Sequence, residues 1–174
     1  MRFTRKNIRL ASGSYIGQRH YFVTICCEER RPVFADEQPV LRCLTRLNET
    51  SVASRFAVHA FCFMPDHLHL LAEGLGTESS LRSFLSPFKQ RTAFEYKRKT
   101  GARLWQAKYY DCILRKSAEM EAVAWYIWMN PVRKGLCADP RDFAHSGSMT
   151  MPWPLGACAR KQWVPPWKPK SLPG

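Results

Sequence analysis

Residues 56–73 read FAVHAFCFMPDHLHLLAE, and this stretch decides the fold. Two apolar runs, Phe56 to Met64 and His67 to Glu73, flank the pair Pro65 and Asp66. Both residues of that pair are turn formers, and each run has the length and composition of a strand. We therefore predict a β-hairpin built from these two runs.

Two further elements precede the hairpin. The run HYFVTICC, His20 to Cys27, is rich in β-branched and aromatic residues and predicts a first strand. Between it and the hairpin, the segment from Gln38 to Ser51 predicts a helix. Its apolar residues at helical spacing are Val40, Leu41, Leu44 and Leu47.

A second helix follows the hairpin. Ser79 or Ser80 can cap its N-terminus, and Gly101 ends it just after Lys99. Pro87 lies inside the apolar stripe and predicts a kink or a split. The residues expected to be buried on this helix are Leu81, Phe84, Leu85 and Phe88.

The last two elements are a strand and a helix. LWQAKYYDCILR, Leu104 to Arg115, predicts a fourth strand. Ser117 can cap a third helix that ends near Asn130, since Pro131 disfavours helical geometry in the residue before it. The stripe expected to dock this helix on the sheet is Met120, Val123 and Ile127.

The resulting order, β-α-β-β-α-β-α, predicts an α+β fold. Its first six elements match a ferredoxin-like split βαβ sandwich, an antiparallel sheet with helices on one face, to which a C-terminal helix is added. We expect one domain over residues 1–148. Residues 149–174, rich in proline, tryptophan and basic residues, are expected to form an extended or disordered tail whose removal after Pro152 leaves the fold intact.

The composition favours a polyanionic partner. Lys and Arg number 27 against 14 Asp and Glu, a net charge of +13, and 13% of residues are aromatic. Together these features favour nucleic acid, although a solvated basic surface, an acidic protein or a membrane surface are alternatives. There is no transmembrane run and no signal peptide. The seven cysteines include no C-x-x-C pair, which predicts reduced thiols in a cytoplasmic protein.

The sequence His67-Leu68-His69 places two imidazoles on one face of a strand, because side chains alternate with period two. Leu68 then points into the opposite, buried face. Two such histidines are a plausible half-site for a divalent metal ion. The alternative is a pair of surface or edge-strand histidines with ordinary hydrogen-bond partners.

Tyr126 and Asn130 are spaced i, i+4 and so share one face of the third helix. The amide oxygen of Asn130 is a hard ligand that suits magnesium or manganese beside the imidazoles. A tyrosine one turn away would present its phenol to a phosphate held by that metal. Alternatively, Tyr126 is an interfacial core aromatic and Asn130 a helix cap.

Basic side chains and tryptophans supply candidate nucleic-acid contacts, lysine and arginine for phosphates and tryptophan for bases. For any one of them alone, an ordinary solvent-facing charge or a core aromatic is the favoured interpretation, so the expectation rests on the whole set. The basic candidates are Arg82, Lys89, Arg91, Lys97, Arg98, Lys99, Arg115, Lys116, Arg133 and Lys134, and the stacking candidates are Trp105, Trp125 and Trp128.

Three blocks in order, MPDHLHLL, LWQAKYYDCILR and YIWMNPVRKGL, resemble the REP-associated tyrosine transposases, part of the insertion sequence 200-like, single-tyrosine HUH group. The resemblance covers residues from about His20 to Ser148. It implies that His67 and His69 bind a catalytic divalent metal (magnesium or manganese), that Tyr126 is the nucleophile, and that Asn130 completes the metal site. One departure is Cys112, where members commonly carry histidine.

The resemblance further implies a metal-dependent transposase or endonuclease of single-stranded DNA. Such an enzyme cleaves and rejoins DNA through a covalent 5′-phosphotyrosine, at short palindromic REP-like hairpins. A cytoplasmic, nucleoid-associated monomer is favoured over a helix-swapped dimer. Two alternatives stay open: a domesticated nucleic-acid-binding regulator with little or no catalysis, and a metal-dependent nuclease in which Tyr126 is structural.

Overall fold

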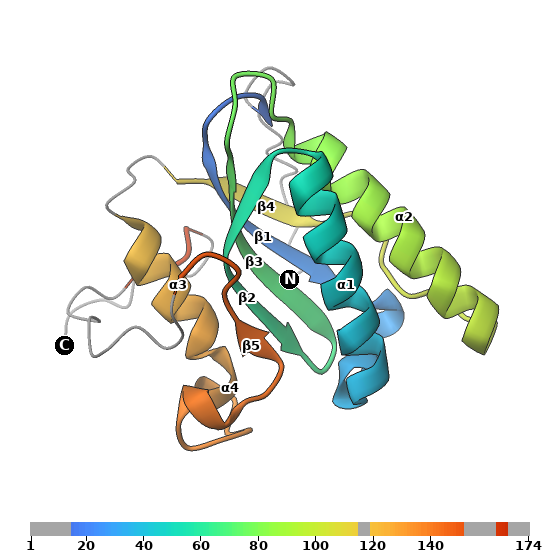
Figure 1. The fold of residues 1–174 in the computed structure, drawn as a ribbon. Coiled ribbons are helices and arrows are strands. Elements are labelled where there is room, and N and C mark those ends of the chain that lie inside the picture. The colour runs from blue at the N-terminus through green and yellow to red at the C-terminus, as the bar shows by residue number, and fades with distance from the viewer. Residues whose placement is uncertain (1–14, 115–118, 152–162, 167–174) are drawn as a thin grey trace, which may run out of the picture.

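The computed structural model describes residues 15–114, 119–151 and 163–166 (Figure 1). Its elements follow the predicted order, with short additions. They are β1 (His20–Cys26), η2 (Glu28–Arg30), η3 (Val33–Ala35), α1 (Glu37–Ala53), β2 (Phe56–Met64), β3 (His67–Gly74), α2 (Leu81–Thr100), β4 (Tyr110–Ile113), α3 (Met120–Trp128), α4 (Asn130–Arg133), η5 (Pro140–Asp142) and β5 (Ser146–Gly147).

The strands form one sheet in the order β4-β1-β3-β2-β5, and every pairing is antiparallel. The predicted hairpin is confirmed, because β2 pairs with β3 from Phe56 opposite Gly74 to Met64 opposite His67. The α+β fold class is confirmed as well. Within the described residues, no helix is long and apolar enough to cross a membrane.

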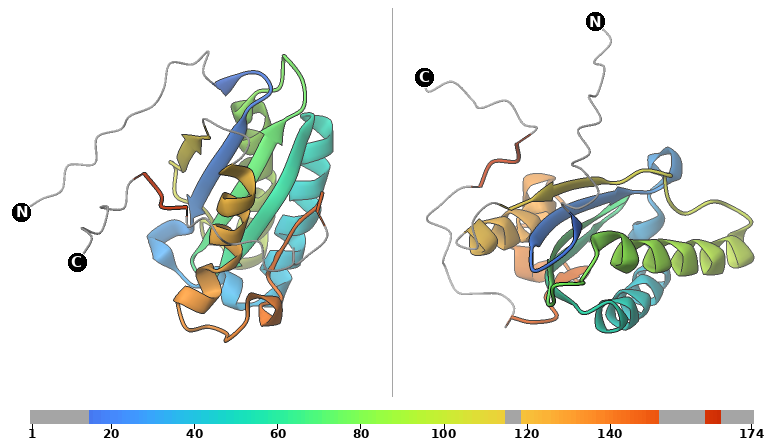
Figure 2. Two further views of the ribbon diagram at one scale, coloured as in Figure 1. Left: turned by 90° about the vertical axis from the view of Figure 1, so that its left-hand side faces the viewer. Right: turned by 90° about the horizontal axis from the view of Figure 1, so that it is seen from above.

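Helices cover both faces of the sheet. α1 and α2 lie side by side on one face, and α3 lies on the other (Figures 1 and 2). Alternate side chains of β1 pack into the two hydrophobic cores, one on each face of the sheet. Tyr21, Val23 and Ile25 belong to the core under α1 and α2, whereas Phe22 belongs to the core under α3. The added C-terminal helix is therefore the one that covers the second face.

The core under α1 and α2 contains the predicted stripe of α2, since Leu81, Phe84, Leu85 and Phe88 are all fully buried. Ser80, not Ser79, is the N-cap, and Gly101 ends α2 with a φ of 73°.

Pro87 does not split α2, which runs unbroken around it. Proline has no N–H to donate to the carbonyl of Ser83, four residues earlier. The hydroxyl of Ser54 donates to that carbonyl instead, at 3.0 Å. A contact from outside the helix thus replaces the missing hydrogen bond.

Two further local expectations were wrong. Leu41 is 47% exposed and not part of the α1 stripe. The fourth strand is limited to Tyr110–Ile113, because Trp105, at the start of the predicted run, forms an isolated bridge with Cys27 instead. The short strand β5 was not predicted. The predicted cap Ser117 lies outside the described residues.

α3 docks on the second face as the sequence predicts. Val123 and Ile127 are fully buried against the sheet, and Met120 packs beside them. The indole N–H of Trp128 donates to the carbonyl of Gly147 at 3.0 Å, which ties α3 to β5. This docking fixes the face on which Tyr126 sits.

Candidate active site

His67 and His69 lie on the face of β3 that α3 covers. Their Nε2 atoms are 3.0 Å apart. The Nδ1 atom of each ring already has a partner: the Asp66 carboxylate lies 2.5 Å from His67 Nδ1, and the Thr24 hydroxyl lies 2.8 Å from His69 Nδ1. Both rings therefore direct their remaining nitrogen to one point.

This pair of nitrogens fits a divalent metal ion. Two adjacent ligands about 2.1 Å from an octahedral ion lie about 3.0 Å apart. Desolvation by burial is the main cause that lowers the pKa of His67 and holds the pKa of His69 well below its usual value, so both rings stay neutral, the form that binds metal. The contacts to Asp66 and Thr24 orient the rings in the way that outer partners of metal-binding histidines do.

Tyr126 approaches the histidines from α3. Phe22 of β1 contacts both groups, with its ring centroid 5.4 Å from that of His69 and 6.1 Å from that of Tyr126. Burial raises the pKa of Tyr126, and the nearby guanidinium of Arg133 works in the opposite direction. That guanidinium lies over the phenol ring, 4.2 Å from its centroid.

Asn130 begins α4, directly after α3, and is 8% exposed. Its Nδ2 donates to the carbonyls of Tyr126 at 3.1 Å and Ile127 at 3.2 Å. In a regular helix the Ile127 carbonyl would bond to the N–H of residue 131, which Pro131 lacks. The side chain therefore caps the end of α3 through nitrogen, and its Oδ1 is the atom suited to a metal ion.

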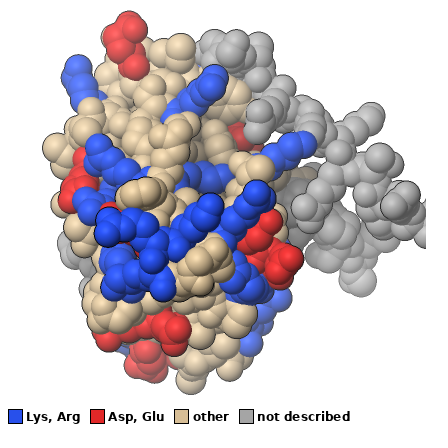
Figure 3. Space-filling view, turned by 90° about the vertical axis from the view of Figure 1, so that its right-hand side faces the viewer, with Lys and Arg blue, Asp and Glu red and all other residues tan. Residues whose placement is uncertain are grey.

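The predicted DNA-binding residues divide between the two faces. Arg133 and Lys134 are exposed at the end of the α3 layer. The candidates on α2 lie across the sheet, where basic side chains gather over α1 and α2 (Figure 3). Arg115 and Lys116 lie outside the described residues. The α2 candidates are Arg82, Lys89, Arg91, Lys97, Arg98 and Lys99.

Two of the α2 candidates contact polar groups within the protein. The Lys89 ammonium donates to the carbonyls of Gln106 and Ala107 at 2.9 and 3.0 Å, and burial lowers its pKa. Arg91 lies 3.7 Å from the Glu49 carboxylate. Lys89 thus fixes the segment before β4, while the other α2 candidates are exposed.

The three tryptophans proposed for base stacking are placed differently. Trp128 is fully buried and Trp105 is 7% exposed, with its N–H donating to Thr92 at 2.8 Å. Both belong to the core, so the expectation that they stack on bases was wrong. Trp125 is half-buried beside Tyr126.

Of the two tyrosines before and in β4, only Tyr110 shares the face of the histidines. Thr24 pairs with Tyr110 on one side and with His69 on the other. Cys112, opposite Phe22, lies on the same face. Tyr109 packs instead against the core under α1 and α2. Tyr110 is therefore the natural comparison for Tyr126.

Sequence reasoning did not identify four residues around this site. Thr24 and Asp66 orient the imidazoles, and the ring of Phe22 contacts both His69 and Tyr126. Trp163, from the predicted tail, packs its ring 4.9 Å from that of Tyr126 and 5.2 Å from that of Phe22. Of these, only Asp66 gave a sequence signal, because it directly precedes His67.

Comparisons with known proteins identify the fold and the family. A REP-associated tyrosine transposase bound to a REP hairpin has a similar fold, with a TM-score of 0.66 and 19% identity over 81% of each chain. An uncharacterized protein of Haemophilus influenzae is 25% identical over 159 residues, 74% of this chain and 88% of its own length. The sequence model of the IS200-like transposases matches residues 16–130, two thirds of the chain, and the protein therefore belongs to the IS200-like transposase family.

Proposed function

We propose that this transposase cleaves and rejoins single-stranded DNA with Tyr126 as the nucleophile. His67, His69 and Asn130 would hold a divalent ion, magnesium or manganese. The observation that carries the proposal is the pair of Nε2 atoms 3.0 Å apart on the face that also bears Tyr126. Asp66 and Thr24 hold the Nδ1 atoms, so the two Nε2 atoms, within hydrogen-bond distance of each other, are the nitrogens left to bind an ion.

The chemistry follows from the difficulty of attacking an anionic phosphodiester. A bound divalent ion neutralises charge on the phosphate and orients it for in-line attack. Tyr126 Oη forms a bond to phosphorus as the bond from phosphorus to the 3′ oxygen breaks, which gives a 5′-phosphotyrosine and a free 3′-hydroxyl. The new bond conserves the energy of the old one, so a 3′-hydroxyl can reverse the attack and join strands.

The residues around Tyr126 govern its proton. Because burial raises its pKa, the phenol is protonated at neutral pH and must release its proton, to water, as it attacks. The Arg133 guanidinium favours the phenolate and, 4.2 Å from the ring, also fixes its orientation. Arg133 is thus well placed to assist the attack.

The substrate is inferred from charge and from the similar structure. The net charge of +13 favours a phosphate backbone as partner. The solved transposase of similar fold is bound to a REP hairpin, and we extend that substrate class to this chain. We favour a monomer, in which Tyr126 serves the histidines of its own chain, over a helix-swapped dimer.

The experiment is a test for covalent protein–DNA adduct with a single-stranded hairpin substrate. Tyr126→Phe should lose adduct and cleavage while it keeps DNA binding, since the ring still fills its place. Tyr110→Phe is the matched control, because it removes a hydroxyl from the same face and should keep the adduct. A regulator would form neither product, and a nuclease with a structural Tyr126 would cleave without adduct. Peptide mapping that found DNA on another residue would overturn the assignment.

A further inference from the structure

A second group of metal-binding side chains lies on the same face of the sheet as His67 and His69. It consists of His20 on β1, His59 on β2 and Glu73 on β3. Their ligand atoms all lie within 4.8 Å of one another, and among the described residues no other three His, Cys, Asp or Glu side chains meet in this way. We infer that these three residues form a second metal site, of the kind that binds zinc.

The contacts converge on one carboxylate oxygen. Glu73 Oε2 lies 2.8 Å from His59 Nε2 and 3.5 Å from His20 Nε2. Two imidazoles and one carboxylate from three strands make three protein ligands, which leaves a fourth tetrahedral position for water. The imidazole nitrogens favour a zinc-type ion over magnesium, which prefers oxygen ligands.

The backbone aims His59 at this point through a β-bulge. The register of β2 against β3 shifts between Val58 and Ala60, so His59 is the unpaired residue of the bulge. Val58 belongs to the core under α1 and α2, and Ala60 to the core under α3. The extra residue thus points to the α3 side with Glu73, and bulges commonly re-aim side chains at functional sites.

A further contact orients the buried histidine as a ligand. The Thr150 hydroxyl lies 2.8 Å from His59 Nδ1, so Nε2 is the nitrogen directed to Glu73. Metal-binding histidines almost always have such a partner on the other ring nitrogen. Thr150 follows β5, and the N–H of the adjacent Met149 donates to the Val58 carbonyl at 3.0 Å. Thr150 is therefore a positioning residue, and an ion here would link β1, β2 and β3 to the segment after β5.

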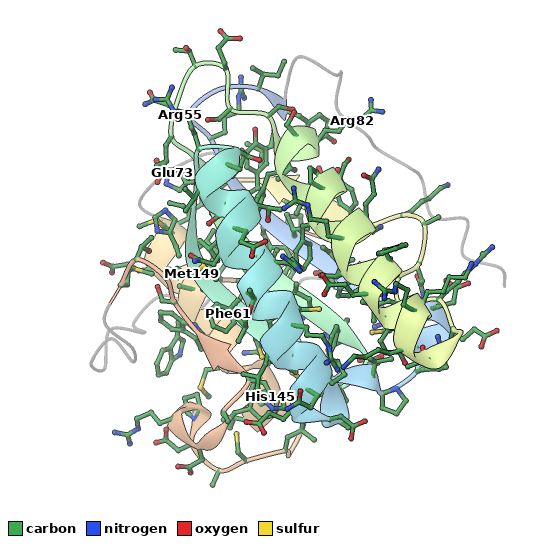
Figure 4. All side chains as sticks on the ribbon, turned by 45° about the vertical axis from the view of Figure 1, so that its right-hand side comes forward. Arg55, Phe61, Glu73, Arg82, His145 and Met149 are labelled. Carbon is green, nitrogen blue, oxygen red and sulfur yellow. The ribbon has the colours of Figure 1, made fainter. Side chains whose placement is uncertain are left out.

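The second site is separate from the candidate active site. Glu73 is four positions after His69 on β3, a separation of about 13 Å along a strand. The site is reachable from solvent, since the side chains of His20 and Glu73 are 18% and 27% exposed. Figure 4 shows Glu73 toward one end of the sheet and His145 toward the other, which makes His145 a suitable control.

The test is a titration with Co²⁺ or Zn²⁺ alone, in the chain that carries His67→Ala and His69→Ala, so that the active-site histidines cannot contribute. Calorimetry should show one ion bound per chain. His59→Gln and, independently, Glu73→Gln should remove it, and His145→Gln should leave it unchanged. Thr150→Val should weaken it roughly 10- to 100-fold, as loss of a hydrogen bond to a metal-binding histidine does.

Three results would overturn the inference. The first is an absence of binding in the chain that carries His67→Ala and His69→Ala. The second is binding that survives both His59→Gln and Glu73→Gln. The third is an intense near-ultraviolet charge-transfer band with Co²⁺, which would show that cysteine sulfur binds the ion. Circular dichroism of each variant verifies its fold, and the two ligand variants act through different strands. Failure here leaves the proposed DNA cleavage untouched, because the titration uses no DNA.

Discussion

Asn130 allows its structural and chemical roles to be separated, because they use different atoms. Nδ2 donates to the carbonyls of Tyr126 and Ile127, and Oδ1 is the proposed metal ligand. Asn130→Ala removes both atoms. Asn130→Asp keeps an oxygen ligand but replaces the donor with a second oxygen that faces two carbonyls.

The cost to stability can be worked from the hydrogen bonds. Each neutral hydrogen bond contributes about 0.5–1.5 kcal/mol net, so two give about 1–3 kcal/mol. Neither carbonyl loses every donor, since Arg133 Nη2 lies 2.6 Å from the Tyr126 carbonyl and the Met129 N–H donates to that of Ile127. We therefore expect Asn130→Ala to lower the free energy of unfolding by about 1–2 kcal/mol, within that range. Asn130→Asp should lower the free energy of unfolding by at least as much, because the new carboxylate oxygen would repel the carbonyl oxygens of Tyr126 and Ile127.

Activity should follow the opposite order. Asn130→Asp should retain manganese-dependent cleavage of a hairpin substrate, because a carboxylate is a good ligand for a hard ion, and Asn130→Ala should lose most of it. Urea unfolding measures the ranking of the two variants in stability, and single-turnover cleavage with saturating metal measures their ranking in activity. If cleavage simply tracks stability, with the alanine variant the more active, Asn130 is a cap and not a ligand.

Four further outcomes are expected. His69→Ala should abolish cleavage while most DNA affinity persists, and full cleavage at saturating magnesium or manganese would remove the metal assignment. Affinity for hairpin DNA should fall steeply as the salt concentration rises, because bound counterions are released. Arg133→Ala should reduce cleavage more than Arg82→Ala, because Arg82 is on α2, across the sheet from Tyr126. Footprinting that placed the scissile phosphate on α2 would contradict this comparison. Truncation after Met151 should keep the melting temperature within a few degrees. It should also increase the chemical modification of Tyr126, because the contact with Trp163 is lost. Unchanged modification would show that Trp163 does not shield Tyr126.

The main elements of the fold could be predicted because their signals are local. The alternation along β1 and β3, the turn at Pro65 and the stripe of α2 each depend on residues close in sequence. Where a distant contact decides the outcome, the prediction was wrong or incomplete. Pro87 is accommodated by Ser54, and the fourth strand is shortened because Trp105 packs in the core and bridges Cys27.

The candidate site divides in the same way. That His67 and His69 share a face follows from strand alternation alone, and the structure confirms the face. Their ligation and the roles of Tyr126 and Asn130 stay predictions. Only one of the two residues that orient the imidazoles could have been predicted from the sequence. Asp66 is adjacent to His67 in sequence, whereas Thr24 comes from another strand and reaches His69 only through the β1–β3 register.

The bulge at His59 shows why such a register matters for function. A strict alternation counted back from Phe61, which faces α1 and α2, would place His59 on that same side, and nothing in the local sequence marks one residue as extra. Only the pairing with β3 reveals the shift, and that shift turns His59 toward Glu73. The same sheet face therefore carries two histidine groups of different origin. One, at His67 and His69, follows from the period of a regular strand, and the other exists because that period is interrupted.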